Sequence, residues 1–344
     1  RYIMRIGLCG YGSMGRHQSQ LFRKHIPVVE LAGIADASAE RRELAAQDHP
    51  GVQLWDSGQE MLANANLDVV FVCVPTYLHA ELSVQALQAG CHVFCEKPMA
   101  LQPEECQTMI TAANESQRSL MIGQVLRFWP EYIYLKELCD SRRYGPLQSL
   151  SMTRVGGVST GWQGWYLDER RGGMQIFDRH IHDSDAVLWI LGQPRAVQSY
   201  GFSLDPHTAG GINHSFTHYD FGPELLVSAE GSADMPAGFP FTAAYRATFA
   251  RACLEFNSRQ QPTLTLYADG QASHPELPNF LEDVSSGLNI SSAGPYFNEQ
   301  AYFFACVRAG RKPATVTPES AMQTIKLVRA EIASCRSAKP VTIQ

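Results

Sequence analysis

The chain has 344 residues, a net charge of −6, and 45% hydrophobic residues against 18% charged ones. This is an ordinary globular composition on a chain too long for one compact core, so we expect two domains. The acidic balance argues against nucleic acid or an anionic membrane as the main partner, and no run approaches the roughly 20 apolar residues of a membrane span.

Nine cysteines are scattered along the chain, and no two of them form a CxxC pair. Several lie inside apolar runs, which favours reduced, buried thiols over a disulfide framework. No secretory leader is evident at the start. We therefore expect a cytoplasmic protein.

The first 124 residues alternate apolar runs with helix-compatible stretches, a pattern typical of a doubly wound parallel sheet. The run "MRIGLC" leads directly into Gly10, Gly12, Ser13, Met14 and Gly15 of a GxGxxG motif. Between a strand and a helix, such glycines permit a tight turn, close approach to a pyrophosphate, and helix-on-strand packing. The motif predicts a dinucleotide whose phosphates lie at the helix N-terminus.

The next apolar run, "VVELAGIAD", ends in Asp36. An acidic residue here binds the adenosine ribose hydroxyls and repels a 2′-phosphate, which favours NAD over NADP. Arg41 and Arg42 follow closely and keep NADP open. The alternative interpretation of Asp36 is a helix N-cap.

Two further runs, "LDVVFVCVP" (67–75) and "CHVFCEKP" (91–98), predict parallel strands buried on both faces. Lys97 follows the second run, at the edge where doubly wound sheets bind ligands. Pro98 restricts the backbone of Lys97 and so fixes its direction. The alternative is an ordinary solvated strand end.

The segments "PTYLHAELSVQALQAGCHVFCEKPMALQPEE", "GQVLRFWPEY", "GGMQIFDRHIH" and "PYFNEQAYFFACVRAGRKPATVTPES" together resemble the Gfo/Idh/MocA oxidoreductases over nearly the whole chain. The resemblance implies a Rossmann domain at 1–124 and an α+β domain at 125–344. The second domain would hold a large, mostly antiparallel sheet that often makes oligomer contacts. It further implies a nicotinamide cofactor and a sugar or polyol substrate.

From about residue 147, short strands separated by Gly, Pro, Asn and Asp agree with that implied sheet. The stretches near 205–212 and 270–295 are rich in Gly, Pro and Ser and predict loops. A last helix at about 317–336 is expected to pack back near the first domain.

The segment "FDRHIHDSD" (177–185) lies in a predicted helix that ends at Gly192. At about 100° per residue, Asp178, His182 and Asp185 fall within about 60° of one another, whereas His180 points elsewhere. A zinc site would need three converging ligands at close range, which this pattern does not clearly supply. A solvated polar face and a proton-relay site remain as the two other interpretations.

The proton-relay interpretation suits the oxidation of an alcohol, since a histidine of ordinary pKa can act as general base near neutral pH. The resemblance matches Lys97, Asp178 and His182 to the family's catalytic lysine, aspartate and histidine. His182 would take the hydroxyl proton, and Asp178 would orient its imidazole. Lys97 would stabilise the developing alkoxide charge.

The resemblance also implies cofactor contacts from Val74, Pro75, Thr76, His79, Glu96 and Gln124. Many members have asparagine where this chain has Gln124. His79 is equally interpretable as a histidine that starts a helix.

On the substrate side, the resemblance implies Arg127, Trp165, Asp168 and Tyr296. Three of these residues also have a structural interpretation. Arg127 would form a salt bridge to Glu131 or Glu137. Trp165 would pack in the core, and Tyr296 would be an aromatic residue at an interface.

The sequence thus predicts an NAD(P)-dependent oxidoreductase that acts on a sugar, inositol or related polyol. We expect a homo-oligomer, a dimer or tetramer formed through the second-domain sheet, and no metal. One alternative is a sugar reductase that prefers NADPH. The other is a non-catalytic dinucleotide-binding sensor of the same fold, because fold alone does not fix function. Which sugar or polyol is bound is not determined by these motifs.

Overall fold

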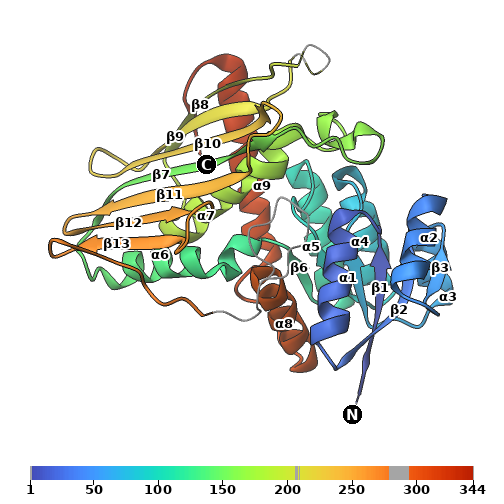
Figure 1. The fold of residues 1–344 in the computed structure, drawn as a ribbon. Helices are drawn as coiled ribbons and strands as arrows, with labels where there is room; N and C mark the ends of the chain where they lie inside the picture. The colour runs from blue at the N-terminus through green and yellow to red at the C-terminus, as the bar shows by residue number, and fades with distance from the viewer. Residues whose placement is uncertain (1, 206–207, 209, 279–293, 344) are drawn as a thin grey trace. The chain divides into compact units, whose positions relative to one another are not determined.

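The structure, a computed structural model, describes residues 2–205, 208, 210–278 and 294–343. The chain divides into two compact units (Figure 1). The first comprises Arg1–Val125 with Phe280–Met322, and the second comprises Leu126–Asn279 with Gln323–Gln344.

A six-stranded parallel sheet forms the centre of the first unit, with strand order β3-β2-β1-β4-β5-β6. Its strands are β1 (Met4–Cys9), β2 (Val29–Ala35), β3 (Gln53–Trp55), β4 (Val69–Val72), β5 (His92–Cys95) and β6 (Leu120–Ile122). Every residue of β4 is completely buried, as its uninterrupted apolar sequence predicts. The predicted doubly wound parallel sheet is confirmed.

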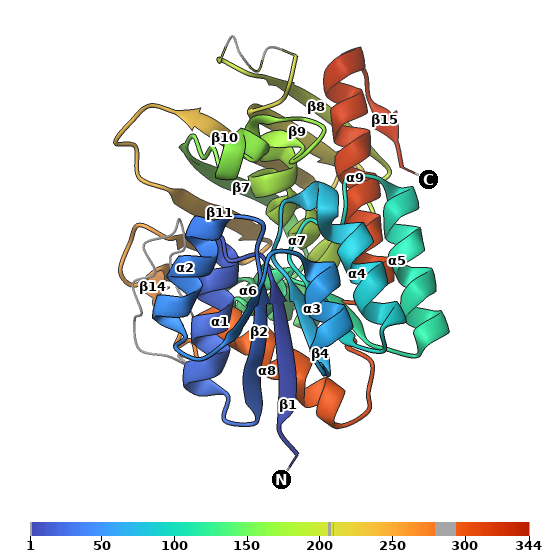
Figure 2. The same cartoon turned by 90° about the vertical axis from the view of Figure 1, so that its right-hand side faces the viewer.

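Helices follow these strands on both faces of the sheet. They are α1 (Ser13–His25), α2 (Ala39–Asp48), α3 (Gly58–Asn64), α4 (His79–Gln88) and α5 (Pro103–Ser116), with a 3₁₀ turn at Thr76–Leu78. Figure 2 shows α1 and α2 on one side of the strands and α3, α4 and α5 on the other. This arrangement leaves the carboxyl ends of the strands open to the loops that carry the predicted cofactor residues.

Helix α8 (Gly294–Arg308) belongs to the first unit, where it packs against α1. Its Phe304 ring lies 5.7 Å from that of Phe71 in β4, and its Phe303 ring lies 5.6 Å from that of Phe94 in β5. The sequence prediction had placed everything after residue 124 in the second domain. The apolar pattern of this helix indicates burial but does not say against which sheet.

The second unit is built on a nine-stranded sheet with strand order β14-β13-β12-β11-β7-β10-β9-β8-β15. Its strands are β7 (Leu147–Gly157), β8 (Ala196–Phe202), β9 (His214–Asp220), β10 (Leu226–Met235), β11 (Thr242–Phe249), β12 (Ala252–Asn257), β13 (Leu264–Ala268), β14 (Gln271–Ser273) and β15 (Val341–Thr342). Strands β7 and β10 pair in parallel, and the other neighbours are antiparallel. The large, mostly antiparallel sheet is therefore confirmed.

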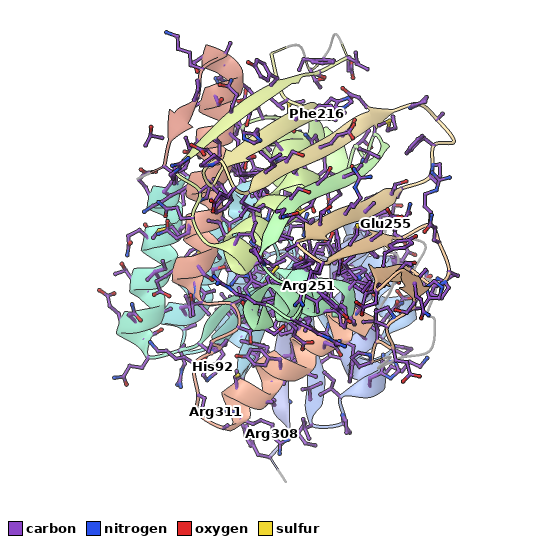
Figure 3. The ribbon with its side chains drawn as sticks, turned by 90° about the vertical axis from the view of Figure 1, so that its left-hand side faces the viewer. His92, Phe216, Arg251, Glu255, Arg308 and Arg311 are labelled. Atoms are coloured by element: carbon purple, nitrogen blue, oxygen red, sulfur yellow. The ribbon has the colours of Figure 1, made fainter. Side chains whose placement is uncertain are left out.

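Helical segments cover one face of this sheet. They are α6 (Pro130–Ser141), the π-helix η4 (Ile176–His180), α7 (Ile181–Leu191) and α9 (Pro318–Ser337), and 3₁₀ turns occur at Val125–Phe128 and Trp162–Leu167. In β9, side chains alternate between buried and exposed, so the opposite face is open. Figure 3 shows Phe216 and Glu255 on that open face.

The last helix, α9, begins within a residue of the predicted position, but from residue 323 onward it belongs to the second unit. The predicted loop near 270–295 contains the short strand β14, and its residues 279–293 lie outside the described part of the chain. Of the predicted loop near 205–212, residues 206, 207 and 209 lie outside it as well.

Candidate active site

The glycine-rich loop after β1 has the close contacts that its motif predicts. A Cβ on Gly15 would lie 1.9 Å from the carbonyl oxygen of Gly10, and a Cβ on Gly10 would lie 2.4 Å from that of Cys73. Gly10 also has a φ of +91°, a conformation that favours glycine. These two glycines are therefore required by the fold of the loop itself.

Gly12 differs, because a Cβ added there meets nothing within 4 Å. It is also the N-cap of α1, whose first residues are Ser13 and Met14, and it has no side chain with which to cap that helix. The first turn of α1 contains no acidic residue. Open space above uncapped backbone N–H groups fits a bound pyrophosphate.

Asp36 lies just after β2 and is tied to the glycine loop. Its carboxylate accepts hydrogen bonds from the backbone N–H groups of Tyr11, at 2.7 Å, and Ser38, at 2.8 Å. Ser38 rather than Asp36 is the N-cap of α2, so the N-cap alternative for Asp36 is wrong. Each carboxylate oxygen retains a lone pair with which it can accept from a ribose hydroxyl.

Two buried polar side chains flank β5 at the same edge of the sheet. Thr76 follows β4 and is 2% exposed, and Gln124 follows β6 and is 1% exposed. Within the described ranges, no group hydrogen-bonds the hydroxyl of Thr76 or either polar atom of the Gln124 amide. Because buried polar groups are normally paired, these atoms fit partners supplied by a bound nicotinamide nucleotide.

Both ring nitrogens of His79, the first residue of α4, lie within hydrogen-bond distance of backbone carbonyl oxygens. Nδ1 lies 2.7 Å from the carbonyl oxygen of Pro98, and Nε2 lies 2.9 Å from that of Val74. Burial lowers its pKa to about 4, so the neutral ring donates to one of these carbonyls. The resemblance implies cofactor contacts from Val74, Pro75, Thr76 and His79, and these contacts stay a prediction. In the structure His79 also connects the loop after β4 to the loop after β5.

Lys97 follows β5 at this edge and is half-buried, whereas the preceding Glu96 is buried. The Nε2 of Gln18 in α1 donates to Glu96 Oε1 at 2.6 Å. The backbone N–H of Lys97 lies 3.3 Å from Glu96 Oε2. Lys97 thus stands at the sheet edge that carries the cofactor residues.

In the second unit, the segment that carries Asp178 and His182 is a π-helix continued by α7. Between residues 172 and 187, all of which the structure describes, Asp178 and His182 are the only two that are not fully buried. The sequence prediction treated this segment as one α-helix. A π-helix bonds i to i+5 and changes the register of the faces, and such turns occur frequently at functional sites.

Asp185 does not share the environment of Asp178 and His182, which corrects the predicted three-residue face. Its carboxylate is 0% exposed and accepts two hydrogen bonds from Arg127, at 2.7 and 3.0 Å. The Thr324 hydroxyl donates to it at 2.8 Å. The predicted salt-bridge partners of Arg127, Glu131 and Glu137, are wrong, because that guanidinium pairs with Asp185.

The remaining charged side chains of the segment also have buried partners. Asp183 accepts two hydrogen bonds from Arg154, and both side chains are buried. His180 Nε2 lies 2.7 Å from Glu331 of α9, with both side chains 0% exposed. The predicted separation of His180 from His182 is confirmed. Sequence reasoning missed Arg154 and Glu331, because nothing local in the chain indicates these distant partners.

The predicted substrate loop before the π-helix is held by its own polar groups. Asp168 accepts from the backbone N–H of Arg170 at 2.8 Å and from Arg171 Nε at 3.0 Å. The half-buried Trp165 ring stacks on Tyr166, with centroids 3.8 Å apart. Asp168 therefore shapes this loop, and Trp165 is not a core residue.

Tyr296 lies in the first unit, on α8. Its half-buried ring packs edge-on against His17 of α1, with centroids 5.2 Å apart. Burial lowers the pKa of His17 to about 4, so this contact is between uncharged rings.

The remaining observations concern the cysteines, possible metal ligands and possible membrane-spanning helices. All nine cysteines are free, as predicted. Within the described ranges, no group of three or more His, Cys, Asp or Glu side chains is arranged to hold a metal ion. In those same ranges, no helix has both the length and the apolar character needed to cross a membrane.

The parallel sheet, the open glycine at the N-terminus of α1 and the acidic residue after β2 define a dinucleotide-binding Rossmann domain. Comparison with known families agrees. A family described as "Oxidoreductase family, NAD-binding Rossmann fold" matches residues 4–124, and one described as "GFO/IDH/MocA C-terminal domain" matches residues 132–251. The chain belongs to the Gfo/Idh/MocA family of NAD-binding oxidoreductases.

Named relatives in this family include sugar and inositol dehydrogenases. Scyllo-inositol 2-dehydrogenase (NAD(+)) from Bacillus subtilis is 25% identical over 346 residues, which covers 99% of this chain and 96% of that protein. D-glucoside 3-dehydrogenase from Escherichia coli is 31% identical over 179 residues, or 51% of this chain. That match spans only about half of the relative's own length, 50%.

Solved structures share the fold over the full chain. Levoglucosan dehydrogenase in complex with NADH and levoglucosan superposes with a TM-score of 0.83 at 20% identity, covering 99% of each chain. Aldose-aldose oxidoreductase from Caulobacter crescentus, complexed with glycerol, superposes with a TM-score of 0.83 at 19% identity, covering 100% of each chain.

Proposed function

We propose that this chain is an NAD-dependent dehydrogenase that oxidises a secondary alcohol of a sugar, inositol or related polyol. The observation that carries the proposal is the exposure pattern of residues 172–187, where only Asp178 and His182 are not fully buried. Because the other polar side chains of this stretch are buried, these two are the ones that a ligand can reach. The dehydrogenase names of the relatives support the substrate class.

In this proposal the chain's own residues manage the proton and the charge of the reaction. His182 takes the proton of the reacting hydroxyl, and Asp178 orients the imidazole and stabilises its protonated form. Lys97 donates to the same oxygen and stabilises its developing negative charge. Bound NAD supplies the hydride acceptor at nicotinamide C4.

NAD rather than NADP is the proposed cofactor, because the Asp36 carboxylate would repel a 2′-phosphate. The Arg42 guanidinium donates to the backbone oxygen of Asp36 at 2.6 Å, which leaves the carboxylate oxygens to accept from a ribose. Substitution Asp36→Ala is expected to relax the preference for NAD at least about tenfold, a change of ~1.4 kcal/mol. The ratio of kcat/KM for the two cofactors checks this, and an unchanged ratio would remove Asp36 from the assignment.

The test of the function is a panel of monosaccharides, inositols and other polyols, assayed with NAD and NADP in parallel by absorbance of the reduced nicotinamide. The Lys97→Ala variant is assayed beside the native chain, and cofactor binding is measured for both. Turnover by the native chain that disappears in Lys97→Ala supports the proposal. If no compound in the panel is turned over while the cofactor still binds, the result would instead favour the alternative of a non-catalytic sensor.

We further propose that two copies associate through the open face of the nine-stranded sheet. Tyr200, Phe202 and Phe216 are each more than half exposed there, at 59%, 56% and 55%. The rings of Phe202 and Phe216 stack on either side of His214, with centroids 5.9 and 5.6 Å apart. A contiguous aromatic row on a sheet face suits a protein contact. Light scattering of Phe216→Glu beside the native chain tests it, and an unchanged mass would reject this face.

The nine free cysteines suit a reducing compartment. We therefore propose that the chain works in the cytoplasm.

A further inference from the structure

The first unit contains two carboxyl groups that share one buried amide. Glu96, which precedes Lys97, is 6% exposed, and Glu299 of α8 is 0% exposed. The Nε2 of Gln18 in α1 donates to Glu96 Oε1 at 2.6 Å and to Glu299 Oε1 at 3.3 Å. Three elements far apart in the sequence thus meet at one polar cluster inside the protein.

The orientation of the central amide is fixed from its other side. Gln300 of α8 is fully buried, and its Nε2 donates to the Gln18 side-chain oxygen and, at 2.9 Å, to the Gln18 backbone oxygen. With its oxygen occupied in this way, the Gln18 amide must present its nitrogen to the two carboxyl groups. An amide nitrogen carries two hydrogens, so it can serve one oxygen of each carboxyl and no more.

Two carboxylates in one dry site repel each other, and one of them keeps its proton. Burial raises the pKa of Glu96 as well, but Glu96 has the better surroundings for a charge, because Gln18 donates to it at 2.6 Å and Lys97 contributes a backbone N–H at 3.3 Å and its side-chain charge. The neighbouring thiol supplies no charge, because burial holds the pKa of Cys73 well above its usual range.

Glu299 has the poorer surroundings for a charge. Among the described residues, Gln18 is the donor that hydrogen-bonds Glu299, at 3.3 Å from Oε1. The other oxygen of Glu299, Oε2, is buried without a hydrogen-bond partner. Burial, together with the charge of Glu96, raises its pKa well above the usual range.

We propose that Glu299 is a permanently neutral acid which, through Gln18, holds Glu96 as the single carboxylate beside Lys97. Glu299 and Gln18 are then positioning residues for the cofactor side of the site, since they touch neither cofactor nor substrate. This role depends on the proposed function, in which Glu96 and Lys97 face the nicotinamide nucleotide. The location of the proton does not depend on it.

Infrared difference spectra of the full chain locate the proton without any activity assay. Native minus Glu299→Gln, at neutral pH, is expected to show the carbonyl band of one protonated carboxylic acid, and native minus Glu96→Gln is expected to show only a lost carboxylate. Subtraction removes the contribution of other buried acids such as Glu131. The reverse assignment of the two bands, or no acid band in either spectrum, would overturn the proposal.

Stability against pH gives a second readout. The native chain keeps the Glu299 proton that the unfolded chain loses above its ordinary pKa of 4.5, so its folding equilibrium constant falls by up to tenfold per pH unit as pH rises above that value. Glu299→Gln should lack this part of the slope, and equal slopes would contradict the assignment. If that variant does not fold, carbon NMR of the native chain with labelled glutamate carboxyl groups replaces it. One glutamate should stay protonated from pH 6 to 8. If every glutamate is ionised over that range, the proposal is refuted.

The positioning role is tested by NAD binding and kinetics of Gln18→Leu, with the exposed Gln88→Leu of α4 as the matched control. Loss of the 2.6 Å donor to Glu96 should raise the Kd and KM for NAD by about tenfold while kcat changes less. Gln88→Leu should leave them unchanged. Equal Kd values for Gln18→Leu and the native chain would remove the positioning role. Absence of turnover in the native chain would instead refute the proposed function and leave the infrared result standing.

Discussion

Two regions of the molecule differ in how their polar groups are arranged. One is the cofactor edge of the first unit, which is formed by the loops that follow β1, β2, β4, β5 and β6. The other is the helix that carries His182. At the cofactor edge, uncharged groups are available beside the charged Asp36 and Lys97: the backbone N–H groups under Gly12, the Thr76 hydroxyl and the Gln124 amide. Around His182, in contrast, charges are numerous and are paired with one another. Arg127, Arg154 and Glu331 each pair with one residue of the segment 177–185.

The difference follows from what each region is expected to bind. A dinucleotide brings its own charge, so the protein needs open space and aligned dipoles there. A proton-transfer residue must keep its geometry through the reaction, and buried ion pairs on its helix fix that geometry at the cost of desolvation. Substitutions that fill the open space of the first region should therefore affect cofactor binding. A substitution in the second region should affect chemistry if it removes a proton-transfer residue, and stability if it removes a member of a buried ion pair.

The largest effect is expected for His182→Ala. Loss of a general base lowers kcat by about 10²–10⁴-fold, while the free energy of unfolding should change by less than ~1 kcal/mol because the side chain is only half-buried. Steady-state kinetics and urea unfolding measure the two quantities. His182→Gln serves as the control for shape. A variant that loses stability together with activity would place His182 among the structural residues instead.

Arg127→Met is expected to destabilise the chain by about 3–5 kcal/mol, because it leaves the fully buried Asp185 carboxylate without its cation. The double variant Arg127→Met, Asp185→Leu should recover most of that loss. Arg195→Met breaks the exposed Arg195–Asp220 pair and should cost less than about 1 kcal/mol. If the buried and exposed variants unfold at the same urea concentration, the contrast between the two kinds of pair fails.

Gly15→Ala and Gly12→Ala separate the fold of the glycine loop from its use. Gly15→Ala forces a Cβ to 1.9 Å from a carbonyl oxygen and should destabilise the cofactor-free chain by about 1–3 kcal/mol. Gly12→Ala meets only open space and should leave that stability within about 1 kcal/mol of the native value. It should nevertheless weaken NAD binding at least about tenfold, as measured by calorimetry. Unchanged NAD affinity in Gly12→Ala would mean that the phosphates lie elsewhere.

The smallest expected effect is on the pH dependence of stability, through the protonation of His180. Burial lowers the pKa of this histidine, but the charge and hydrogen bonding of Glu331 outweigh burial and raise it above the usual 6.5. A raised pKa stabilises the fold fully below pH 6.5, and this stability is lost as pH rises through the folded-state pKa. His180→Gln should remove up to ~1.4 kcal/mol per pH unit of that loss. Unfolding midpoints from pH 5.5 to 9 for both chains check it, and parallel curves would rule out a charged His180.

Much of the fold follows from local pattern. The completely buried β4 and the parallel sheet are readable from continuous β-branched runs, and β7 begins at the predicted residue 147. The GxGxxG loop and Asp36 were also identifiable, since their spacing relative to strand and helix carries the signal.

The features that sequence reasoning did not predict depend on contacts between distant segments. His182 and Asp185 lie three residues apart in the regular helix α7, so helical spacing predicts a shared face, but Asp185 is buried against Arg127, which lies 58 residues away in the sequence. The His79 ring lies between two carbonyl oxygens on different loops, and Gln18 donates to Glu299, which lies 281 residues away in the sequence. Such pairings depend on tertiary packing, which a single sequence does not reveal.

In the proposed reaction, His182 removes the hydroxyl proton while hydride leaves the carbon that bears this hydroxyl for NAD. Rapid mixing of NAD-loaded native chain and His182→Gln with a panel substrate deuterated at the reacting carbon tests it most directly. The native chain should transfer deuterium to the nicotinamide with a primary isotope effect, and His182→Gln should slow that transfer by at least about a hundredfold. Equal transfer rates in the two chains would show that another group takes the proton.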